Sequence, residues 1–351
     1  MKIAMIAPLE IRVPPEAYGG IELVVSLITE ALIRRGHDVT LFASGDSVTE
    51  ARLVPGSERF LRNSDKSLEE KAALEKRNVM ACLERASEFD IINLHLLSEG
   101  LALEKLFLCG SSRTPVLATL HGPHRELDEC ERQLFLAYPG YYSTISLSTK
   151  QLLPEKEKFA GVTYNGIDFQ SYPFNDGVRE GYLLFLGSLT PNKAPHLAIE
   201  VARRLGRKLL LIGAVYEPAR EYFQTKVEPE IDGDLIQYVG EVNEQQKRKL
   251  FAQADCLLAP IAWQEGFGMY FIEAMASGVP VVTFRRGSAQ EVISHNETGF
   301  VVEPDNVVDM MVAVMNVPHI NRAQCRRRVE ERFSVDIMVD IYLEKYRHIL
   351  E

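Results

Sequence analysis

The chain has 351 residues, of which 46% are hydrophobic and 25% are charged, and its formal net charge is −10. This length exceeds what one hydrophobic core usually supports, so we expect two domains. The acidic balance argues against a nucleic-acid-binding protein, because there is no domain-wide excess of Lys and Arg to compensate phosphates. A composition close to the globular norm also excludes the disordered and fibrous classes.

The cysteines and the first residues favour a reducing compartment. The five cysteines form no CxxC pair and their number is odd, which suits reduced thiols and signals no zinc site. The opening MKIAMIAPLE predicts a first strand, since its apolar run is too short for a secretory signal. No apolar run approaches the roughly 18 residues that a membrane span requires. The sequence therefore predicts a cytoplasmic location and no transmembrane segment.

The first half of the chain alternates between short apolar runs and helical patterns, which is typical of a parallel sheet covered by helices on both faces. The apolar runs predict strands at 3–7, 39–43, 91–94 and 116–120. The helical patterns between them predict helices at 21–34, 68–86 and 101–108. Turn-forming residues at 165–168 and 173–177 then mark a linker.

A second alternation follows the linker. The predicted strands are 182–187, 209–212, 236–239, 256–259 and 279–283. The predicted helices are 194–205, a segment from the N-cap Asn243 to 254, and one that begins near Gly268. After 300–303 the chain is expected to be helical to its end, with Ser334 as an N-cap. This pattern predicts an α/β protein with two Rossmann-like, doubly wound domains facing a central cleft.

The expected domain boundaries follow from this alternation. An N-terminal domain is expected over 1–170 and a C-terminal domain over 171–333. The final helix, at about 334–351, is expected to pack back on the N-terminal domain. Ligands of such sheets bind beyond the carboxyl ends of the strands, so we expect the functional residues there.

The most informative motif is EGFGMYFIEAMASGVPVV at 265–282, in which Glu265 and Glu273 bracket a glycine-spaced turn that leads into a helix. Gly266 and Gly268 let the backbone approach a ligand, and the N–H groups of the helix start favour an anion. Glu265 is then expected on the loop and Glu273 within the helix, which Gly278 ends with a left-handed cap. An amphipathic helix with two solvated glutamates is the alternative, and the surrounding glycines favour the binding site.

Three weaker signals lie near predicted strand ends. Gly19 and Gly20 precede the first helix, where backbone amides can meet a phosphate, but the GxGxxG dinucleotide pattern is not met and a tight loop is equally consistent. TLHGPH places His121 directly after a strand, with His124 and His95 as weaker candidates and a structural histidine as the alternative. Lys193 precedes the helix at 194–205, either facing a diphosphate or lying on the surface.

Two short basic clusters are expected to be solvated helix faces, with an anionic acceptor or a membrane surface as the less favoured contact. They are Arg203-Arg204 and Arg326-Arg327-Arg328.

Motifs throughout the chain resemble the GT-B glycosyltransferases of the large retaining family four, also called group one. They follow one another in the order of that family: YGGIE, RRGHDVTLFASGDS, TLHGPH, YNGID, LGSLTPNKAPHLAIE, YVGEV, the 265–282 stretch, GSAQEV, TGFVV and ERFS. The resemblance implies a retaining, metal-independent enzyme that transfers a hexose from a nucleoside diphosphate sugar, with UDP as the expected carrier. The partners it implies are the nucleotide sugar and a hydroxyl acceptor bound by the N-terminal domain.

The resemblance also implies roles for individual residues. Glu273 resembles the glutamate that accepts hydrogen bonds from the ribose, Glu265 the one that faces the transferred sugar, and Lys193 the diphosphate-binding lysine. His121 resembles the histidine near the hydroxymethyl group of the sugar. The catalytic residues implied are therefore Glu265, His121 and Lys193. Donor contacts, several through backbone amides, are implied for Gly19, Gly20, Gly187, Lys193, Val242, Phe267, Gly268, Met269, Tyr270 and Glu273. No metal and no cofactor are expected, since lysine, arginine and helix dipoles can stabilise the leaving diphosphate.

The sequence departs from the family pattern in the segment that precedes Lys193. Ser188 stands where the family usually has an arginine, which removes one bidentate phosphate contact, and Arg285 or Arg286 are candidates to replace it. Ala194 and Gly266 are milder departures, replacing a glycine and a proline. The alternatives are a sugar phosphorylase or donor hydrolase on the same fold and a noncatalytic sugar-nucleotide-binding protein. The sequence leaves a homodimer open.

Overall fold

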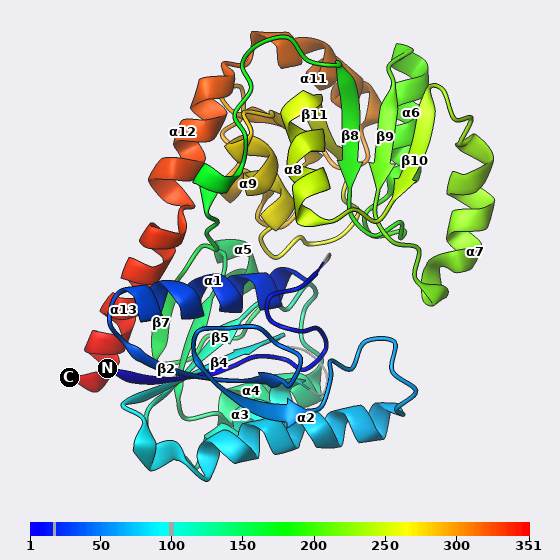
Figure 1. Ribbon diagram of the computed structural model, residues 1–351. Coiled ribbons are helices and arrows are strands. Elements are labelled where there is room, and N and C mark those ends of the chain that lie inside the picture. The colour runs from blue at the N-terminus through cyan, green and yellow to red at the C-terminus, as the bar shows by residue number, and fades with distance from the viewer. Residues whose placement is uncertain (17–18, 98–101) are drawn as a thin grey trace. The chain divides into compact units, whose positions relative to one another are not determined.

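The computed structural model describes residues 1–16, 19–97 and 102–351, and Figure 1 shows its helices and strands. The chain forms two compact units, one of residues 1–166 with 335–351 and the other of residues 167–334. The expected change of domain at 170 lies within a few residues of the one at 167, and the last helix belongs to the N-terminal unit. The expected motif residue Tyr18 and helix residue Leu101 lie outside the described residues.

The N-terminal unit contains a parallel sheet of seven strands in the order β3-β2-β1-β4-β5-β6-β7. Its strands are β1 (Lys2–Ile6), β2 (Asp38–Ser44), β3 (Arg52–Ser57), β4 (Ile91–Leu96), β5 (Val116–Leu120), β6 (Tyr141–Thr144) and β7 (Phe159–Val162). The first strand lies inside the sheet between β2 and β4, with Ile3 opposite both Val39 and Ile91, as in a doubly wound sheet. The four predicted strands are confirmed.

Three strands of this sheet were not predicted, and they lie at its two sides. The edge strand β3 contains Pro55 and Gly56 and is partly exposed, so it shows no continuous apolar run. The other two, β6 and β7, are four residues each, too short for a recognisable period. Edge and short strands escape a search for buried apolar runs because their burial is incomplete.

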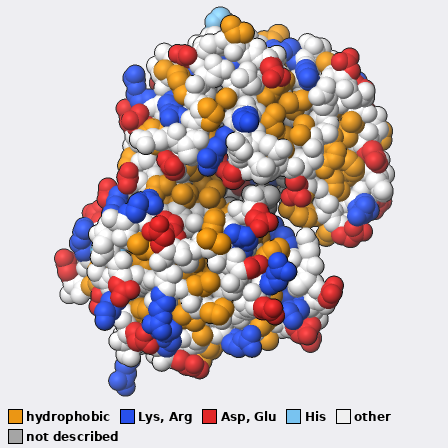
Figure 2. Space-filling model, in the orientation of Figure 1, with side chains coloured by type: hydrophobic (Ala, Val, Ile, Leu, Met, Phe, Trp, Pro, Cys, Tyr) orange, Lys and Arg blue, Asp and Glu red, His pale blue; other side chains and the backbone are white. Residues whose placement is uncertain are grey.

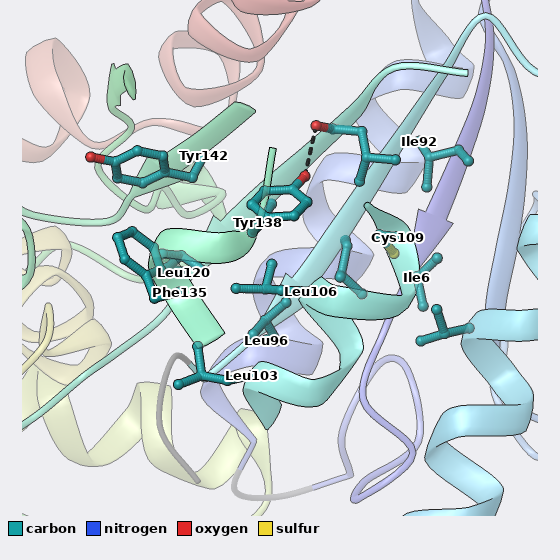
Figure 3. Close-up of a cluster of buried hydrophobic side chains, with 14 of the residues drawn as sticks. Ile6, Ile92, Leu96, Leu103, Leu106, Cys109, Leu120, Phe135, Tyr138 and Tyr142 are labelled. Atoms are coloured by element: carbon teal, nitrogen blue, oxygen red, sulfur yellow. Dashed lines mark hydrogen bonds between the residues drawn. The ribbon is translucent and has the colours of Figure 1, made fainter. Parts of the chain in front are cut away.

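Helices cover both faces of this sheet. On one face α1 (Gly20–Arg34) packs against α13 (Val335–Leu350), and on the other α2 (Leu68–Leu83), α3 (Ala102–Cys109) and α4 (Glu129–Ala137) pack in sequence. Figure 3 shows the apolar cluster on the second face, where Leu106 of α3 and Phe135 of α4 meet the sheet residue Leu120. Tyr138 is buried in this cluster and its hydroxyl donates a hydrogen bond to the Val116 carbonyl at 3.0 Å. A short helix, α5 (Leu147–Gln151), follows β6.

The last helix, α13, is tied to the N-terminal unit by polar contacts as well as by packing. Arg35 bonds the carboxylates of Asp340 and Asp336 at 2.7 and 2.9 Å. Buried Asn93 of β4 donates to the Tyr346 hydroxyl at 2.7 Å. These contacts join residues about 250 to 300 positions apart, so the packing of the N-terminal unit is complete only when the chain returns to it.

The C-terminal unit contains a second parallel sheet, of six strands in the order β10-β9-β8-β11-β12-β13. Its strands are β8 (Tyr182–Leu186), β9 (Leu209–Ile212), β10 (Ile236–Gly240), β11 (Ala254–Ala259), β12 (Val281–Phe284) and β13 (Gly299–Val302). All five strands predicted for this half are found, and β13 forms one edge. The two-sheet α/β prediction is therefore confirmed.

Helices again cover both faces. One face carries α8 (Glu244–Gln253) and α9 (Met269–Ala276), with α12 (Arg322–Arg332) against α9, and the other carries α6 (Pro195–Leu205) and α11 (Val307–Asn316). The short helices α7 (Arg220–Tyr222) and α10 (Ala289–Val292) lie in connections. Asn243 caps α8 as predicted, its side chain accepting from the Gln246 amide at 2.9 Å.

The surface is polar and mixed in charge. Figure 2 shows acidic and basic side chains interspersed over the visible face, with scattered apolar side chains between them. Among the described helices there is none that is both long and apolar enough to cross a bilayer.

Candidate functional site

The predicted donor residues of the C-terminal unit lie in loops that follow the carboxyl ends of its strands and in helix α9, which begins at the end of one such loop. The strands β8, β11 and β12 are parallel, so the loops that follow them begin at the same edge. Gly187 follows β8, Glu265 lies in the loop after β11, and Arg285 follows β12.

Glu265 and Lys193 form a buried ion pair within this loop region. Both residues are less than a tenth exposed, and the Lys193 ammonium bonds Glu265 Oε2. The same carboxylate oxygen accepts the Tyr270 hydroxyl at 3.0 Å and lies 3.3 Å from the indole nitrogen of Trp263. The interpretation of Lys193 as a surface lysine is therefore wrong, and two of the three residues expected to take part in catalysis, Lys193 and Glu265, are in direct contact.

Two aromatic rings enclose the Lys193 ammonium. Its Nζ lies 4.9 Å from the centre of the Trp263 ring and 4.7 Å from that of Tyr270. Cation–π contacts of this kind stabilise a positive charge where water is excluded. Sequence reasoning assigned Tyr270 only a backbone role and missed Trp263, although this single tryptophan lies two residues before Glu265.

Backbone contacts hold the Glu265 loop in place. The Ser288 amide donates to the Glu265 carbonyl at 2.9 Å, and the Ala262 amide donates to the Asn192 carbonyl at 2.8 Å. Gly287 has a positive φ of 57°, and a Cβ there would lie 2.1 Å from the Glu265 carbonyl oxygen. A glycine is therefore required at this position, because any side chain would displace the loop.

Glu273 forms a second, separate ion pair. It is the third residue of the buried stretch of α9, and its Oε1 accepts hydrogen bonds from the Lys247 ammonium at 2.8 Å and from the Tyr172 hydroxyl at 3.1 Å. Burial by itself disfavours the charged form of Lys247, but the carboxylates of Glu273 and Glu244 raise its pKa above the ordinary value. Burial, together with the charge of Glu273, raises the pKa of Tyr172 well above its usual range.

The partners of Glu273 were not found from the sequence. Tyr172 lies about a hundred positions away and Lys247 lies on a different helix. The one available signal was local, since Lys247 and Glu244 are three residues apart on α8 and pair at 2.6 Å. That spacing is typical of an ion pair on a helix surface, so it did not indicate that Lys247 also pairs with the buried Glu273.

The helix start between the two glutamates has the predicted geometry. Gly268 is the N-cap of α9 with φ 76°, and a Cβ there would lie 2.5 Å from the Phe271 ring. Phe267 is buried, and its ring meets Phe333 edge-on at 5.7 Å, so its side chain belongs to the core. Glu265 lies in the loop and Glu273 in the helix, as predicted. Gly278, with φ 77°, ends this helix in the left-handed conformation, which is also confirmed.

Ser188 and the two candidate arginines occupy different surroundings. The Ser188 hydroxyl lies 3.4 Å from that of Thr190. Arg285 pairs with Glu303, and Arg286 pairs with Asp305 at 2.6 Å. Both guanidinium groups that could have replaced the missing phosphate contact at position 188 are thus paired with carboxylates of residues that follow β13.

The remaining C-terminal donor residues lie in loops after β8 and β10. Gly187 is packed so closely that a Cβ on Gly213 would lie 1.8 Å from its carbonyl oxygen. Val242 lies in the loop between β10 and α8 and is partly buried. Their contacts with a nucleotide remain predictions.

In the N-terminal unit, Gly19 and Gly20 form the start of α1. Gly19 is the N-cap and Gly20 the first helical residue, and a Cβ on Gly19 would lie 2.8 Å from the Pro15 side chain. Glu22, in the first turn, is buried, and this burial raises the pKa of its carboxyl to about 7. A role of the glycines in phosphate binding remains a prediction.

His121 is buried and paired with another histidine. Its Nε2 lies 3.0 Å from Nδ1 of His95, and the rings are 5.3 Å apart. Burial lowers the pKa of His121 to about 3 and that of His95 well below its ordinary value. Nε2 of His95 is buried without a hydrogen-bond partner among the described residues. The structure thus brings together two of the three histidines singled out from the sequence, while His124 is partly buried.

Of the two basic clusters expected to be solvated, only the first lies fully on the surface. Arg203 and Arg204 pair with acidic residues on the surface. Arg326 instead donates to the carbonyl of Ala276, the last residue of α9, and Arg328 donates to that of Val292 at 2.6 Å. The prediction is wrong for these two because their guanidinium groups satisfy carbonyls at helix ends.

A metal centre is not evident in the described ranges, which contain no group of three or more His, Cys, Asp or Glu arranged to hold an ion.

Comparisons with known proteins agree with this architecture. Residues 168–331 match the family described as Glycosyl transferases group 1, and residues 18–171 match Glycosyltransferase Family 4. The putative glycosyltransferase YtcC of Bacillus subtilis is 26% identical over 340 residues, covering 87% of this chain and 80% of the relative.

Two solved structures share the fold. The sucrose-phosphate synthase of Thermosynechococcus elongatus superposes with a TM-score of 0.82 at 17% identity, covering 99% of this chain and 98% of the other. HepE of Anabaena, solved in complex with UDP and glucose, superposes with a TM-score of 0.75 at 18% identity, covering 99% and 100%. The two family matches, together with the two sheets, show that the chain belongs to the group 1 glycosyltransferases, enzymes of the GT-B fold.

Proposed function

We propose that this glycosyltransferase is a retaining hexosyltransferase that uses a UDP-sugar as donor and a hydroxyl group as acceptor, without a metal ion. The observation that carries the proposal is the presence of two Glu–Lys pairs with buried carboxylates, Glu265–Lys193 just before the glycine-started helix α9 and Glu273–Lys247 within it. The UDP complex of HepE supports the choice of donor.

Each pair has a distinct part in this proposal. Lys193 would turn from Glu265 to the diphosphate, where the N-terminus of α9 adds a positive dipole. Glu265, freed from the ammonium, would accept a hydrogen bond from a hydroxyl group of the hexose. Lys247 and Tyr172 hold the Glu273 carboxylate in position, so its remaining lone pairs can accept the two ribose hydroxyls.

In the transfer step the bond between the anomeric carbon and the diphosphate oxygen breaks, while a bond to the acceptor oxygen forms on the same face of the sugar. The acceptor proton goes to the departing diphosphate. The protein contributes position and charge, chiefly through Lys193 and the helix dipole, which stabilise the leaving group. Glu265 is not required to form a covalent bond.

A second candidate function follows from Ser188, whose neutral hydroxyl has Thr190 as its neighbour. A protein that lacks the usual arginine here could bind the nucleotide sugar without transferring the sugar. Restoring the arginine with Ser188→Arg separates the two candidates. Activity that exists before the change supports the enzyme, and activity that appears only after it supports the binding protein.

A donor screen tests the proposed specificity. Purified protein is heated with UDP-, GDP- and ADP-sugars, since a ligand that binds only the native state raises the apparent stability. We expect UDP-sugars to raise Tm, and Glu273→Gln to lose the shift while the surface variant Glu200→Gln keeps it. A shift with only GDP- or ADP-sugars would contradict the choice of base.

The stereochemistry and the metal are tested on the same enzyme. With an α-linked donor we expect NMR of the product to show an α linkage, and the rate to be unchanged by EDTA. A β linkage would refute retention, and a rate lost with EDTA and restored by a divalent cation would refute metal independence.

A further inference from the structure

A cavity lies in the C-terminal unit at the end of the sheet opposite to the donor residues. It has a volume of about 340 Å³ and is lined near the amino ends of three strands by Leu183 of β8, Asp255 of β11 and Arg207, which precedes β9. Residues from the linker before β8 and from the start of α12 also line it, and an apolar wall is formed by Val314 of α11 with Val317, Pro318 and Ile320. Lys193, Glu265 and Glu273 all follow the carboxyl ends of strands, so the cavity is separate from them.

Three arginines surround a single carboxylate in this cavity. Arg207 bonds Asp255 Oδ2, while Nε of Arg179 and a terminal nitrogen of Arg322 lie 3.6 and 3.9 Å from Oδ1. The other charged residue in the lining is Asp176, which is exposed at the rim. Three positive and two negative side chains leave an excess of one positive charge, in a chain whose net charge is −10.

The arginines are held in place by backbone carbonyls. Arg322 donates to the Gly278 carbonyl at 3.0 Å, Arg207 to that of Gly181 at 3.0 Å, and Arg179 to that of Gly177 at 2.8 Å. These bonds fix the directions of the guanidinium groups without neutralising them. The cluster is therefore preorganised, and its geometry does not depend on surface side chains that are free to move.

Two features show that the charges are not fully compensated. Nε of Arg179 is buried and has no hydrogen-bond partner in the described part of the chain. Burial and the nearby charge of Arg179 lower the pKa of Arg322 below its ordinary value. The carboxylates and backbone carbonyls of the cavity therefore leave Nε of Arg179 without an acceptor and an excess of one positive charge, and an added anion would meet both.

We propose that this cavity binds a small, soluble phosphomonoester through Arg179, Arg207 and Arg322. A phosphate dianion presents oxygens that match the planar fork of a guanidinium group. The positive end of α12, an 11-residue helix that begins at Arg322, adds to the attraction. The cavity is at the small end of the range for ligand sites, which favours a compact metabolite over a nucleotide sugar.

Titration with inorganic phosphate at constant ionic strength tests the site. Isothermal calorimetry is carried out on the whole protein and on Arg179→Gln, with Arg203→Gln as the matched control, because Arg203 pairs with Glu230 and Asp232 on the surface of the same unit. We expect saturable binding that is at least about tenfold weaker in Arg179→Gln and unchanged in the control. Equal affinity in the two variants, or the same heat from chloride, would overturn the proposal.

A variant that is expected to bind phosphate more tightly shows whether the loss in Arg179→Gln could come from misfolding. Asp176→Asn removes a negative charge from the exposed rim, and we expect it to tighten phosphate binding by about threefold. A loss of structure cannot produce tighter binding. Unchanged or weaker binding in Asp176→Asn would count against an electrostatic site.

Further titrations separate this site from the donor site and identify the source of the phosphate. Saturating UDP is expected to leave phosphate binding unchanged, and competition between them would place the anion at the donor residues. If UDP did not bind, the proposed function would be weakened. The comparison of phosphate binding by Arg179→Gln and Arg203→Gln would still test the cavity. Glucose 6-phosphate is expected to bind where glucose does not. Binding to phosphatidic acid vesicles without binding of glucose 6-phosphate would refute a soluble ligand.

Discussion

The two units bury polar side chains in different ways. The C-terminal unit buries carboxylates against ammonium groups, in the pairs Glu265–Lys193 and Glu273–Lys247. The N-terminal unit instead buries His95 against His121, whose pKa values are both lowered by burial, and Glu22, whose pKa is raised by burial. At these sites the C-terminal unit keeps compensated charges, and the N-terminal unit favours neutral forms.

This difference has a consequence for ligands and for pH. A compensated ion pair can exchange one partner for a charged ligand, which suits a site for a diphosphate. A group kept neutral by burial gives up that neutrality only at a cost to stability, so it makes stability depend on pH. The C-terminal unit is therefore expected to respond mainly to ligands and the N-terminal unit mainly to pH.

The largest expected effect is that of breaking a charge pair. Glu265→Gln leaves the buried Lys193 ammonium without its counterion, and removing one partner of such a pair costs about 3–5 kcal/mol. We expect that loss in urea unfolding, together with at least about a tenfold lower turnover, since the contact with the reacting sugar loses its charge.

The double variant Lys193→Met, Glu265→Gln distinguishes these two effects. It removes both charges, so at least half of the lost stability should return while the activity stays low. An unchanged turnover in Glu265→Gln would contradict its role in transfer. A double variant no more stable than the single one would contradict the ion pair as the cause.

The next effect concerns Glu22 of the N-terminal unit. Burial raises the pKa of its carboxyl from 4.5 to about 7, so the folded state favours the protonated form. Its stabilising contribution is complete below pH 4.5 and is lost as the pH rises through 7. Glu22→Gln keeps the neutral form, so at pH 8 it should be more stable than the wild type by about 3 kcal/mol, and at pH 4 about equal.

Urea unfolding at the two pH values measures this difference, with the exposed Glu50→Gln as the control. Parallel stability curves for the wild type and Glu22→Gln would show that Glu22 is not held neutral.

A smaller effect of opposite sign is expected for His121. Burial lowers its pKa from 6.5 to about 3, so the unfolded state binds a proton first as the pH falls. Stability is thus full above pH 6.5 and is lost below it. Between pH 7 and pH 5 the wild type should lose about 2 kcal/mol more than His121→Asn.

The exposed residue His348 provides the control, since His348→Asn should follow the wild type. If His121→Asn lost as much stability as the wild type over this range, the histidine pair would have to be open to protons in the folded protein.

The smallest effect lies in the turn beside Lys193. Ala194 has φ 52° and ψ 51°, a left-handed conformation that costs a residue with a Cβ about 1–2 kcal/mol. Ala194→Gly should therefore raise the free energy of unfolding, by about 1 kcal/mol after the loss of its buried methyl group. The same change at Ala198, which is buried within the right-handed helix α6, should lower it by about 1 kcal/mol. Thermal unfolding of both variants gives the comparison, and a shift of the same sign in both would contradict the conformational explanation.

Much of the fold could be predicted because its signals are local. The central strands are continuous apolar runs, and the caps at Asn243 and Gly278 identify helix ends by residue type alone. The edge strand β3 was missed because Pro55 and partial exposure interrupt its pattern. The same limit applies to the site, where Glu265 and Glu273 were found from their spacing but the partners Trp263, Tyr172 and Lys247 were not.

The amino-acid sequence by itself determined the two α/β units, the helix start between the two glutamates and the family to which the chain belongs. These depend on periodicity, glycine positions and short motifs, all of which are properties of neighbouring residues. Only the tertiary structure decided which lysine pairs with which glutamate, that His121 is bonded to His95, and that three arginines share Asp255. Those contacts join residues from different strands and helices, and burial then sets their charge, so no local pattern encodes them.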